Sequence, residues 1–216
     1  MHWFAHSHHK ESDETSAHET QGSVINWGWR YDLMVWYFDT VMFHGKLQEL
    51  RFQVADLAQL QRGETVLDVG CGTGTQALVA KERVGETGRV YGVDPGPKQI
   101  AHARSKAARR GLPIDFQVGV IEQLPFSAQV FDVVLSTFMM HHLPDDLKRR
   151  GLAEIARVLK PGGRLVVLDM KGPVRPWKSR LAGQPALMKG AGFSQIETGD
   201  TRFQRLGFVR ARKSSS

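Results

Sequence analysis

The chain has 216 residues, of which 41% are hydrophobic and 24% charged, and its formal net charge is +7. These values are ordinary for a soluble globular protein and are typical of one domain with a substantial core of its own. The only cysteine is Cys71, which excludes an intrachain disulfide, and no apolar run approaches the roughly 20 residues of a membrane-spanning helix. Because residues 1–21 are polar and unlike a secretory signal, the sequence predicts a cytoplasmic protein.

Residues 1–22 form a polar segment that is rich in histidine and has no apolar periodicity. Such a composition cannot bury enough apolar surface to order itself, so we expect a disordered or loosely attached tail. His6, His8 and His9 are the metal-ligand candidates of this tail. Without rigid geometry they predict no metal site.

Residues 23–62 are predicted to form a helical lid ahead of the main domain. Seven aromatic residues crowd into Trp27–Phe43, where we expect a helix. A second helix is predicted at Lys46–Leu60, where Leu and Val recur at spacings of three and four and make one apolar stripe. An aromatic helix in this place has no obvious partner except the open carboxyl edge of a following sheet, so we expect it to cover that edge.

From residue 63 to residue 216, short apolar runs alternate with helical stretches. The runs are Thr65–Val69, Val90–Val93, Ile114–Val118, Val130–Leu135 and Leu165–Leu168. The helical stretches are Thr75–Val84, Lys98–Arg110 and Asp145–Leu159, the last ended by a turn at Pro161-Gly162-Gly163. Phe193–Thr201 and Leu206–Arg212 are predicted to add a hairpin at one edge. The pattern predicts an α/β domain with a Rossmann-like, doubly wound, seven-stranded sheet, mostly parallel with an antiparallel C-terminal strand.

The sharpest local motif follows the first of these strands. Asp68 near the strand end precedes a G-x-G-x-G loop made of Gly70, Gly72 and Gly74, and a helix begins after it. Glycines suit a loop where the backbone turns sharply and a ligand touches it, and doubly wound sheets bind ligands at this end. A dinucleotide fingerprint would be G-x-G-x-x-G. An acid at the strand end would also repel a pyrophosphate, whereas it suits a ligand that carries an ammonium group.

A second carboxylate, Asp94, ends the second predicted strand 20 residues beyond Gly74. A carboxylate at that position can accept hydrogen bonds from both hydroxyls of an adenosine ribose. The ordered set of Asp68, three glycines and Asp94 in a βαβ frame therefore predicts an adenosyl cofactor without phosphate. S-adenosylmethionine fits, because its methionine part carries an ammonium, a carboxylate and a sulfonium.

The sequence from about Tyr31 to Lys213 resembles the class I S-adenosylmethionine-dependent methyltransferases. Leu67–Gly74 is similar to that family's first motif, Gly92-Val93-Asp94 to the second, and Gly119–Phe126 to its adenine-binding segment. Further matches are Phe131–Val134 with His141–Leu143, Arg157–Gly163, and Ala191–Phe193. Arg30-Tyr31-Asp32 and Leu124-Pro125-Phe126 resemble most the ubiquinone/menaquinone-biosynthesis C-methyltransferases and their small-molecule relatives.

The resemblance implies a set of residues around the cofactor. They are Asp68, Gly70, Cys71, Gly72, Thr73, Gly74, Asp94, Pro95, Val120, Ile121, Glu122 and Thr137. The chain departs from the family at Val120, where an Asp is usual, so the adenine amino group is left to a backbone carbonyl or a water. It also has only the residues from Lys171 to Gly190 where the quinone enzymes carry a longer insert.

Methyl transfer from a sulfonium needs alignment of the acceptor and exclusion of water, and a base only where the acceptor carries a proton. His141 and His142 follow the fourth predicted strand and are the candidate bases. One of them could instead pack beneath the loop. Tyr31 could face the methyl group with its ring, or pack over the cleft like any aromatic. We expect the acceptor between Tyr31 and Tyr37 on one side and Phe138–His142 on the other.

Ten Lys or Arg residues and two acids lie in residues 171–213, an excess larger than the whole net charge. This basic third is either a solvated surface or an attraction for nucleic acid, an anionic membrane or an anionic substrate. We expect methylation of a small or amphiphilic acceptor such as a quinol, phenol, thiol or lipid headgroup, with peripheral contact to an anionic membrane. One alternative is a tRNA or rRNA methyltransferase, although this sequence has no Asn/Asp-Pro-Pro-Tyr loop after the fourth strand. The other is a non-catalytic adenosyl-binding module.

Overall fold

The computed structural model describes residues 22, 24–42, 44–172 and 181–215, so the expected His-rich tail and most of the stretch before Leu181 lie outside it. The strands are β1 (Thr65–Val69), β2 (Arg89–Asp94), β3 (Asp115–Val118), β4 (Phe131–Thr137), β5 (Leu159–Met170), β6 (Phe193–Asp200) and β7 (Leu206–Lys213). The helices are α1 (Trp29–Met42), α2 (Leu47–Leu57), α3 (Thr75–Val84), α4 (Pro97–Arg109), α5 (Asp145–Val158) and α6 (Gln184–Gly190), with short 3-10 turns at Met140–His142 and Leu181–Gly183.

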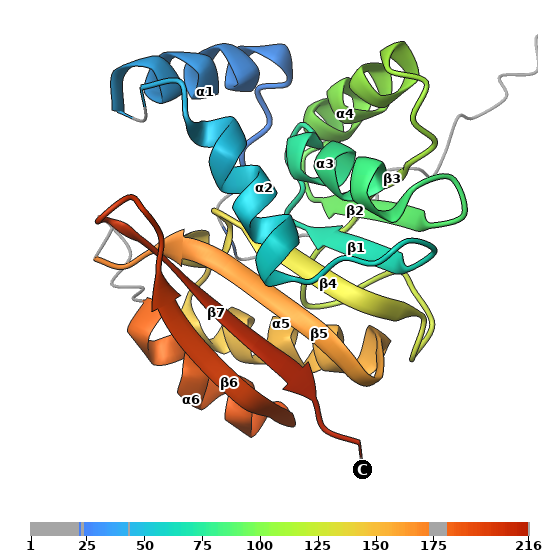
Figure 1. The fold of residues 1–216 in the computed structure, drawn as a ribbon, viewed down its shortest axis with the longest axis vertical. Coiled ribbons are helices and arrows are strands. Elements are labelled where there is room, and N and C mark those ends of the chain that lie inside the picture. Colours follow the sequence, from blue (N-terminus) through green and yellow to red (C-terminus); the bar gives the residue numbers. More distant parts are fainter. Residues whose placement is uncertain (1–21, 23, 43, 173–180, 216) are drawn as a thin grey trace, which may run out of the picture.

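All seven strands belong to one sheet with the order β3-β2-β1-β4-β5-β7-β6 (Figure 1). The pairs from β3 to β5 are parallel, and β7 runs antiparallel to both of its neighbours. This confirms the predicted doubly wound fold with an antiparallel C-terminal strand. After β1 the chain builds outward through β2 and β3, then returns to the other side of β1 with β4. The two halves of the sheet diverge there, and such a switch point opens a crevice at the carboxyl ends of the strands.

Two elements differ from their predicted form. β5 begins at Leu159, which pairs with Phe131, and the register shifts before Val133 pairs with Arg164. The Pro-Gly-Gly turn is therefore a bulge inside a long strand, with Gly162 at a φ of 73°. The second difference is α6, for which we predicted no element. Its proline in the first turn suits a helix start because that N–H has no intrahelical partner in any case.

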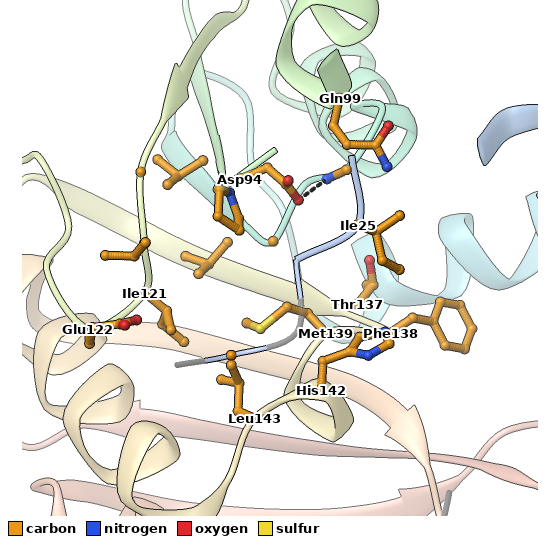
Figure 2. A pocket seen from close by; sticks show the side chains of 18 of the residues that line it. Ile25, Asp94, Gln99, Ile121, Glu122, Thr137, Phe138, Met139, His142 and Leu143 are labelled. Atoms are coloured by element: carbon orange, nitrogen blue, oxygen red, sulfur yellow. Dashed lines mark hydrogen bonds between the residues drawn. The ribbon is translucent and has the colours of Figure 1, made fainter. Parts of the chain in front are cut away.

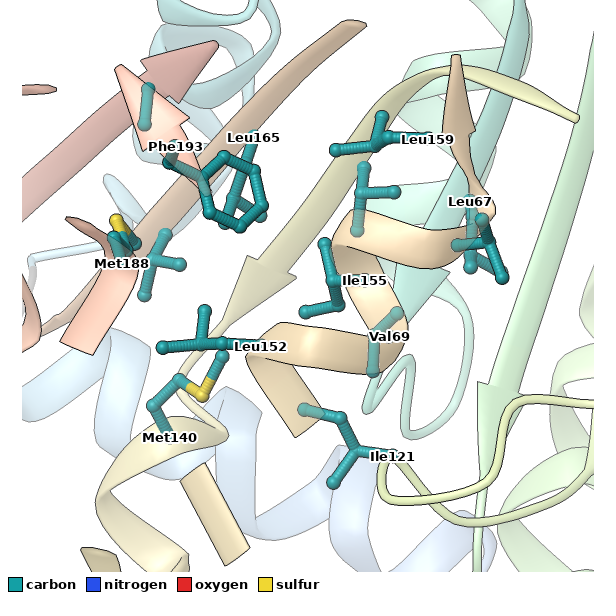
Figure 3. Close-up of a cluster of buried hydrophobic side chains, with 14 of the residues drawn as sticks. Leu67, Val69, Ile121, Met140, Leu152, Ile155, Leu159, Leu165, Met188 and Phe193 are labelled. Carbon is teal, nitrogen blue, oxygen red and sulfur yellow. The ribbon is translucent and has the colours of Figure 1, made fainter. Parts of the chain in front are cut away.

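Two apolar cores cover the two faces of the sheet. On one face, α5 and α6 pack Leu152, Ile155 and Met188 against inward side chains such as Leu67 (Figure 3). On the other, α2, α3 and α4 cover the neighbouring strand positions, among them Val66 (Figure 1). Side chains alternate across a strand, so β1 contributes to both cores. Each fully buried Leu or Ile contributes roughly 1.5–3 kcal/mol, and together they hold the strand ends in place.

Helix α1 lies at the carboxyl edge and carries an exposed apolar stripe. Trp29, Leu33 and Trp36, spaced by four and three residues, lie on its outer side and are 56–63% exposed. On the other side of the helix, Tyr31 points into the cavity described below. None of the helices in the ranges given above combines the length and apolar character that crossing a bilayer requires.

Candidate functional site

A cavity opens at the switch point, beyond the carboxyl ends of β1, β2 and β4 (Figure 2). The space among its lining residues, counted together with the part open to solvent, is about 720 Å³. Its lining comprises Gly22, Ile25, Tyr31, Val69, Gly70, Gly72, Val93, Asp94, Pro95, Gln99, Gly119, Val120, Ile121, Glu122, Thr137, Phe138, Met139, His142 and Leu143. Eight of the twelve predicted cofactor residues are in this lining. Asp68, Cys71, Thr73 and Gly74 are not.

The three glycines of the loop serve different purposes. All have positive φ, 72° at Gly70, 53° at Gly72 and 77° at Gly74, where side chains are disfavoured. A Cβ at Gly70 would lie 2.2 Å from Met139, and one at Gly74 would lie 2.6 Å from Phe116. These two glycines therefore permit close packing. Gly72 lines the cavity and has only the Tyr31 ring nearby, so its backbone is open to a ligand.

The Asp94 carboxylate joins the glycine loop to the end of β2. One oxygen accepts the Gly72 N–H at 2.9 Å (Figure 2), and the other accepts the Gly96 N–H at 2.9 Å. Burial raises the pKa of Asp94 to about 6, although these two hydrogen bonds oppose the rise. An ionised carboxylate has about four acceptor sites. Asp94 therefore retains capacity for the two ribose hydroxyls of an adenosine.

Asp68 lies beside it on β1, fully buried and outside the cavity lining. Burial and the nearby Asp94 charge raise the pKa of Asp68 to about 7, partly opposed by the Ala77 amide and by Arg51. Neither carboxylate oxygen has a partner within hydrogen-bonding geometry in the described part of the chain. A buried carboxylate without a partner is costly, and a cationic group above it would relieve that cost. Asp68, the bare Gly72 and Asp94 together fit an ammonium-bearing adenosyl ligand.

The predicted adenine segment forms one wall of the cavity. Val120 and Ile121 are 4% and 6% exposed and present apolar surface to it. Gly151 on α5 makes room for this wall, since a Cβ there would lie 2.6 Å from the Ile121 side chain. Glu122 lines the same wall, and its Oε2 has no hydrogen-bond partner within the described residues. It supplies a polar acceptor close to the place where Val120 replaces the usual Asp.

The two histidines after β4 take different places. His142 lines the cavity, and its ring lies against that of His141 with the ring centroids 4.0 Å apart. His141 is buried, with Nδ1 2.6 Å from Asp169 Oδ1 and its backbone N–H donating to Asp169 Oδ2 at 2.9 Å. Asp169 also accepts the Met170 N–H. Because the Asp169 carboxylate accepts these hydrogen bonds, the His141 ring must carry its proton on Nδ1. His141 therefore holds the loop in place, whereas His142 faces the cavity.

Burial and neighbouring charges determine the protonation of His142 and Tyr31, the two titratable rings in the cavity lining. Burial and the neighbouring His141 lower the pKa of His142 to about 4, against a smaller opposing effect of Asp169. Burial raises the pKa of Tyr31, and Asp94 raises it further. At neutral pH the cavity therefore presents a neutral imidazole and a neutral phenol. Tyr37, expected beside Tyr31, is 58% exposed and lies outside the lining.

Thr73 and Cys71 face away from the cavity. The Thr73 hydroxyl bonds the Asp32 carboxylate of α1, which also accepts from Lys106 Nζ at 2.8 Å and meets His102 Nε2 at 3.1 Å. This network ties α1 to the glycine loop and to α4. Cys71 packs in the core, where burial raises the pKa of its thiol well above the usual value.

No sequence motif pointed to Asp169 or to the cavity residue Gln99. Asp32 lies in the Arg30-Tyr31-Asp32 segment named above, but no motif indicated its bonds to Thr73 and Lys106. In the stretches that the structure describes, no three His, Cys, Asp or Glu side chains come together as a metal site.

A Rossmann-like sheet with a glycine loop and a ribose-type carboxylate at its switch point defines a class of nucleoside-cofactor-binding domains. Residues 66–163 match a family model described as a methyltransferase domain. The chain is 38% identical over 144 residues to a demethylmenaquinone methyltransferase of Thermus thermophilus, covering 67% of this chain and 62% of that one. A demethylmenaquinone methyltransferase of Shouchella clausii is 32% identical over 167 residues, covering 77% and 67%.

Among solved structures, a SAM-dependent methyltransferase from Aquifex aeolicus matches with a TM-score of 0.64 and 25% identity, over 75% of this chain and 88% of that one. The chain thus spans about three fifths to two thirds of the length of the two curated relatives. It belongs to the S-adenosylmethionine-dependent methyltransferase family, whose cofactor is S-adenosylmethionine. This confirms the family and the cofactor predicted from the motifs.

The raised pKa of Asp68 predicts that its carboxylate lowers the stability of the ligand-free protein at high pH but strengthens cofactor binding. Because its folded pKa of about 7 exceeds the ordinary value of 3.8, the folded state loses stability as pH rises from about 4 to 7. Asp68→Asn should therefore raise the melting temperature of the ligand-free protein at pH 8, with the gain shrinking by pH 5. The same variant should bind S-adenosylhomocysteine more weakly because the ammonium loses its partner. Thermal melts and calorimetric titration measure both.

Asp132→Asn is the matched control, because Lys160 and the Thr65 N–H lower the pKa of Asp132 despite its partial burial. Its substitution should lower the melting temperature at pH 8, the opposite sign. If Asp68→Asn also lowered it at pH 8, the Asp68 carboxylate would be well solvated or paired, and the argument above would be wrong.

Proposed function

We propose that the protein transfers a methyl group from S-adenosylmethionine to a small apolar or amphiphilic acceptor, such as a quinol, phenol, thiol or lipid headgroup. The observation that carries this is the apolar wall that the loop after β4 contributes to the cavity. Phe138, Met139 and Leu143 line it with aromatic, thioether and aliphatic groups, together with Ile25 from the N-terminal segment (Figure 2). No Lys or Arg is among the described lining residues, which argues against a highly charged acceptor.

The backbone at Phe138 supports a functional wall. It has a φ of 56°, which a bulky residue rarely adopts, and its N–H donates to Leu168 O at 2.9 Å. Strained backbone of this kind persists where the surroundings hold it and often lies at binding sites. It turns the chain sharply after β4, so that Phe138 and Met139 both reach the cavity.

The bound cofactor would supply an activated methyl group on its sulfonium. The residues of this chain would orient the acceptor between Tyr31 and the Phe138–His142 loop and exclude water from the cavity. His142, neutral at physiological pH, would accept a proton or a hydrogen bond from the acceptor. The names of the two relatives above specify demethylmenaquinone, an apolar acceptor, which supports an amphiphilic acceptor here.

A methyl-transfer screen tests the proposed function. Tritiated cofactor is offered with quinols, phenols, thiols, phospholipids and tRNA, and we expect transfer to a member of the first four classes. Asp94→Ala should abolish most of it, since losing the ribose contacts costs about 1–3 kcal/mol of affinity. Asp115→Asn, an exposed carboxylate on β3, is the matched control and should keep full activity. Transfer to tRNA alone would overturn the proposed acceptor class.

The role of His142 predicts a distinct pH profile. With a pKa of about 4, its ring is neutral above pH 5 and becomes charged as the pH falls toward 4. We therefore expect the titration of His142 to leave kcat unchanged from pH 8 to 5.5 and to lower kcat below pH 5. His142→Ala should lower kcat by roughly 10- to 100-fold, while affinity for S-adenosylhomocysteine is kept.

His44→Ala, at an exposed position, is the control and should leave kcat unchanged. Full turnover in His142→Ala would show that the acceptor arrives already ionised, as a thiolate does, and that no base is used.

We also propose that the protein is cytoplasmic and meets an anionic membrane through the outer stripe of α1. Trp side chains favour the membrane–water interface, and Trp29, Leu33 and Trp36 are exposed together on this helix. The Arg30 guanidinium lies 5.8 Å from the centre of the Trp29 ring, which adds positive charge to the stripe. A net charge of +7 complements anionic lipid.

Vesicle sedimentation tests this contact. The protein should pellet with phosphatidylserine vesicles at low salt and less with neutral vesicles, and Trp29→Ser/Trp36→Ser should reduce pelleting. Phe52→Ser on α2, at a 38% exposed apolar position, is the control. Unchanged pelleting of the double variant, or a dimer in light scattering that the double variant dissolves, would overturn the membrane proposal.

A further inference from the structure

A second pocket lies on the sheet, apart from the cavity at the switch point. Leu57 and Gln59, at the end of α2, form one side of it, and residues of β5, β6 and β7 form the rest. The space among its lining residues, counted together with the part open to solvent, is about 500 Å³. On this face of the sheet α2 lies beside β5, and none of the described helices covers β6 or β7 (Figure 1).

Three arginines make this pocket cationic, and we call it the arginine pocket. Arg164 of β5 pairs directly with Arg212 of β7. Arg210 lies two residues before Arg212 and therefore on the same face of the sheet. Like charges on directly opposed strand residues destabilise a sheet. Among the described lining residues the only acid is Glu197, so the pocket holds more positive than negative charge.

Arg164 and Arg212 differ in how far their donors are used. Arg164 donates from Nε to the Ala58 carbonyl at 2.8 Å and from Nη2 to both Glu64 carboxylate oxygens at 2.7 Å, which holds the end of α2 against the sheet. Arg212 donates only from Nη1, to the Gly162 carbonyl at 3.2 Å. Within the described structure its Nε and Nη2 have no acceptor. These two groups form one edge of the guanidinium, so an oxyanion can accept from both at once.

Arg210 is the second cation that an anion can reach. Its Nε and Nη2 donate to one oxygen of Glu197 at 2.8 and 2.6 Å. The Glu197 side chain is 59% exposed, and an ion pair this exposed contributes little to stability. An anion of higher charge can therefore displace Glu197 from Arg210 at small cost. Glu197 is thus the competitor of any anion that enters the pocket.

Two glutamines line the pocket from strained backbone. Gln59 has a φ of 51° and Gln195 one of 48°, a region that glycine adopts without strain. Gln195 lies in a β-bulge, where the register of β6 and β7 shifts between Ser194 and Glu197. Bulges redirect side chains, and strained backbone often lies at binding sites. An amide side chain can donate hydrogen bonds to an oxyanion, so both residues suit the same kind of ligand as the arginines.

The arginine pocket is separate from the cofactor cavity. The two linings share no residue. Arg164 pairs with Val133, which precedes the cavity residue Thr137 by four residues on β4. At about 3.3 Å per residue, this places Arg164 roughly 13 Å along the sheet from that end. A ligand held by Arg212, opposite Arg164, therefore leaves the cavity open to the cofactor and the acceptor.

We propose that the arginine pocket binds the phosphate group of a small ligand, with Arg212 and Arg210 as the cations and Gln59 and Gln195 as further donors. A phosphate monoester carries about −1.5 to −2 charges and three acceptor oxygens at neutral pH. It can therefore engage two guanidinium groups at once, whereas a carboxylate offers two oxygens and one charge. Forked guanidinium groups match this geometry. The basic C-terminal third of the sequence thereby gains a defined ligand site.

Calorimetric titration of the full-length protein with pyrophosphate, in the presence of saturating S-adenosylhomocysteine, tests the site. We expect saturable binding with one site per chain. Arg212→Gln and Arg210→Gln should each weaken it by about 10- to 100-fold, the range for hydrogen bonds to a charged group. Arg150→Gln, which removes an exposed arginine of α5, is the matched control and should keep the affinity.

Glu197→Gln should bind pyrophosphate more tightly than the unaltered protein, because the competing carboxylate is gone. Asp200→Asn removes an exposed carboxylate from the same strand and should leave the affinity unchanged, which separates competition at Arg210 from a change in net charge. Equal tightening in both variants would overturn the role of Glu197. Equal weakening in Arg212→Gln and Arg150→Gln would overturn the site.

Arg212→Gln should melt close to the unaltered protein, since relief of the repulsion from Arg164 offsets the lost hydrogen bond to Gly162. It should also keep its affinity for S-adenosylhomocysteine, which shows that the cofactor site is intact. The absence of saturable pyrophosphate binding to the unaltered protein would overturn the proposal. So would binding of a short single-stranded RNA that pyrophosphate does not displace. No methyl acceptor is used, so each result is independent of the proposed methyl transfer.

Discussion

The site depends on two carboxylates that lie side by side, largely shielded from water, at the carboxyl ends of two neighbouring strands. Asp68 and Asp94 stand on the neighbouring parallel strands β1 and β2, where the pairing of Val69 with Val93 brings them to the same edge. Burial and mutual repulsion raise the pKa of Asp68 to about 7, and burial raises that of Asp94 to about 6. The loop amides satisfy Asp94 alone. The fold therefore maintains a local excess of negative charge that a ligand bearing an ammonium, a sulfonium and ribose hydroxyls relieves.

The packing around this edge makes the charge arrangement rigid. Phe116 from β3 occupies the space that side chains at Gly74 and Gly92 would fill, so the loop and the strand can approach each other closely. On the opposite face, Gly151 of α5 lets Ile121 lie against the helix and complete the cavity wall. The two cores thus determine the shape of the site from both faces of the sheet. The Asp32 network adds the third boundary by binding α1 to the glycine loop.

Most elements were predictable because their signals are local. Thr75–Val84 and Thr65–Val69 have the predicted bounds, and the loop between them is set by spacing within one βαβ unit. Contacts between distant segments were not predictable. Thr73 matches the cofactor motif, yet its hydroxyl bonds Asp32, 41 residues earlier, because alternate loop residues face opposite ways. His141 likewise depends on Asp169, 28 residues later, and nothing in its own surroundings distinguishes it from His142.

The protonation of His142 narrows the chemistry that the cavity can support. A phenol has a pKa near 10, and His142 has one of about 4. Moving a proton between them would cost about 8 kcal/mol, at 1.36 kcal/mol for each pKa unit. That cost is too large for an ordinary phenol to be activated by His142 before methyl transfer. The cost of proton transfer to His142 is much smaller for an acceptor that ionises readily, such as a thiol, an acidic enol or a quinol with electron-withdrawing substituents. The acids that attract the cofactor also disfavour a free anion in the cavity, so the proton should leave as the methyl group moves, with the neutral imidazole accepting it.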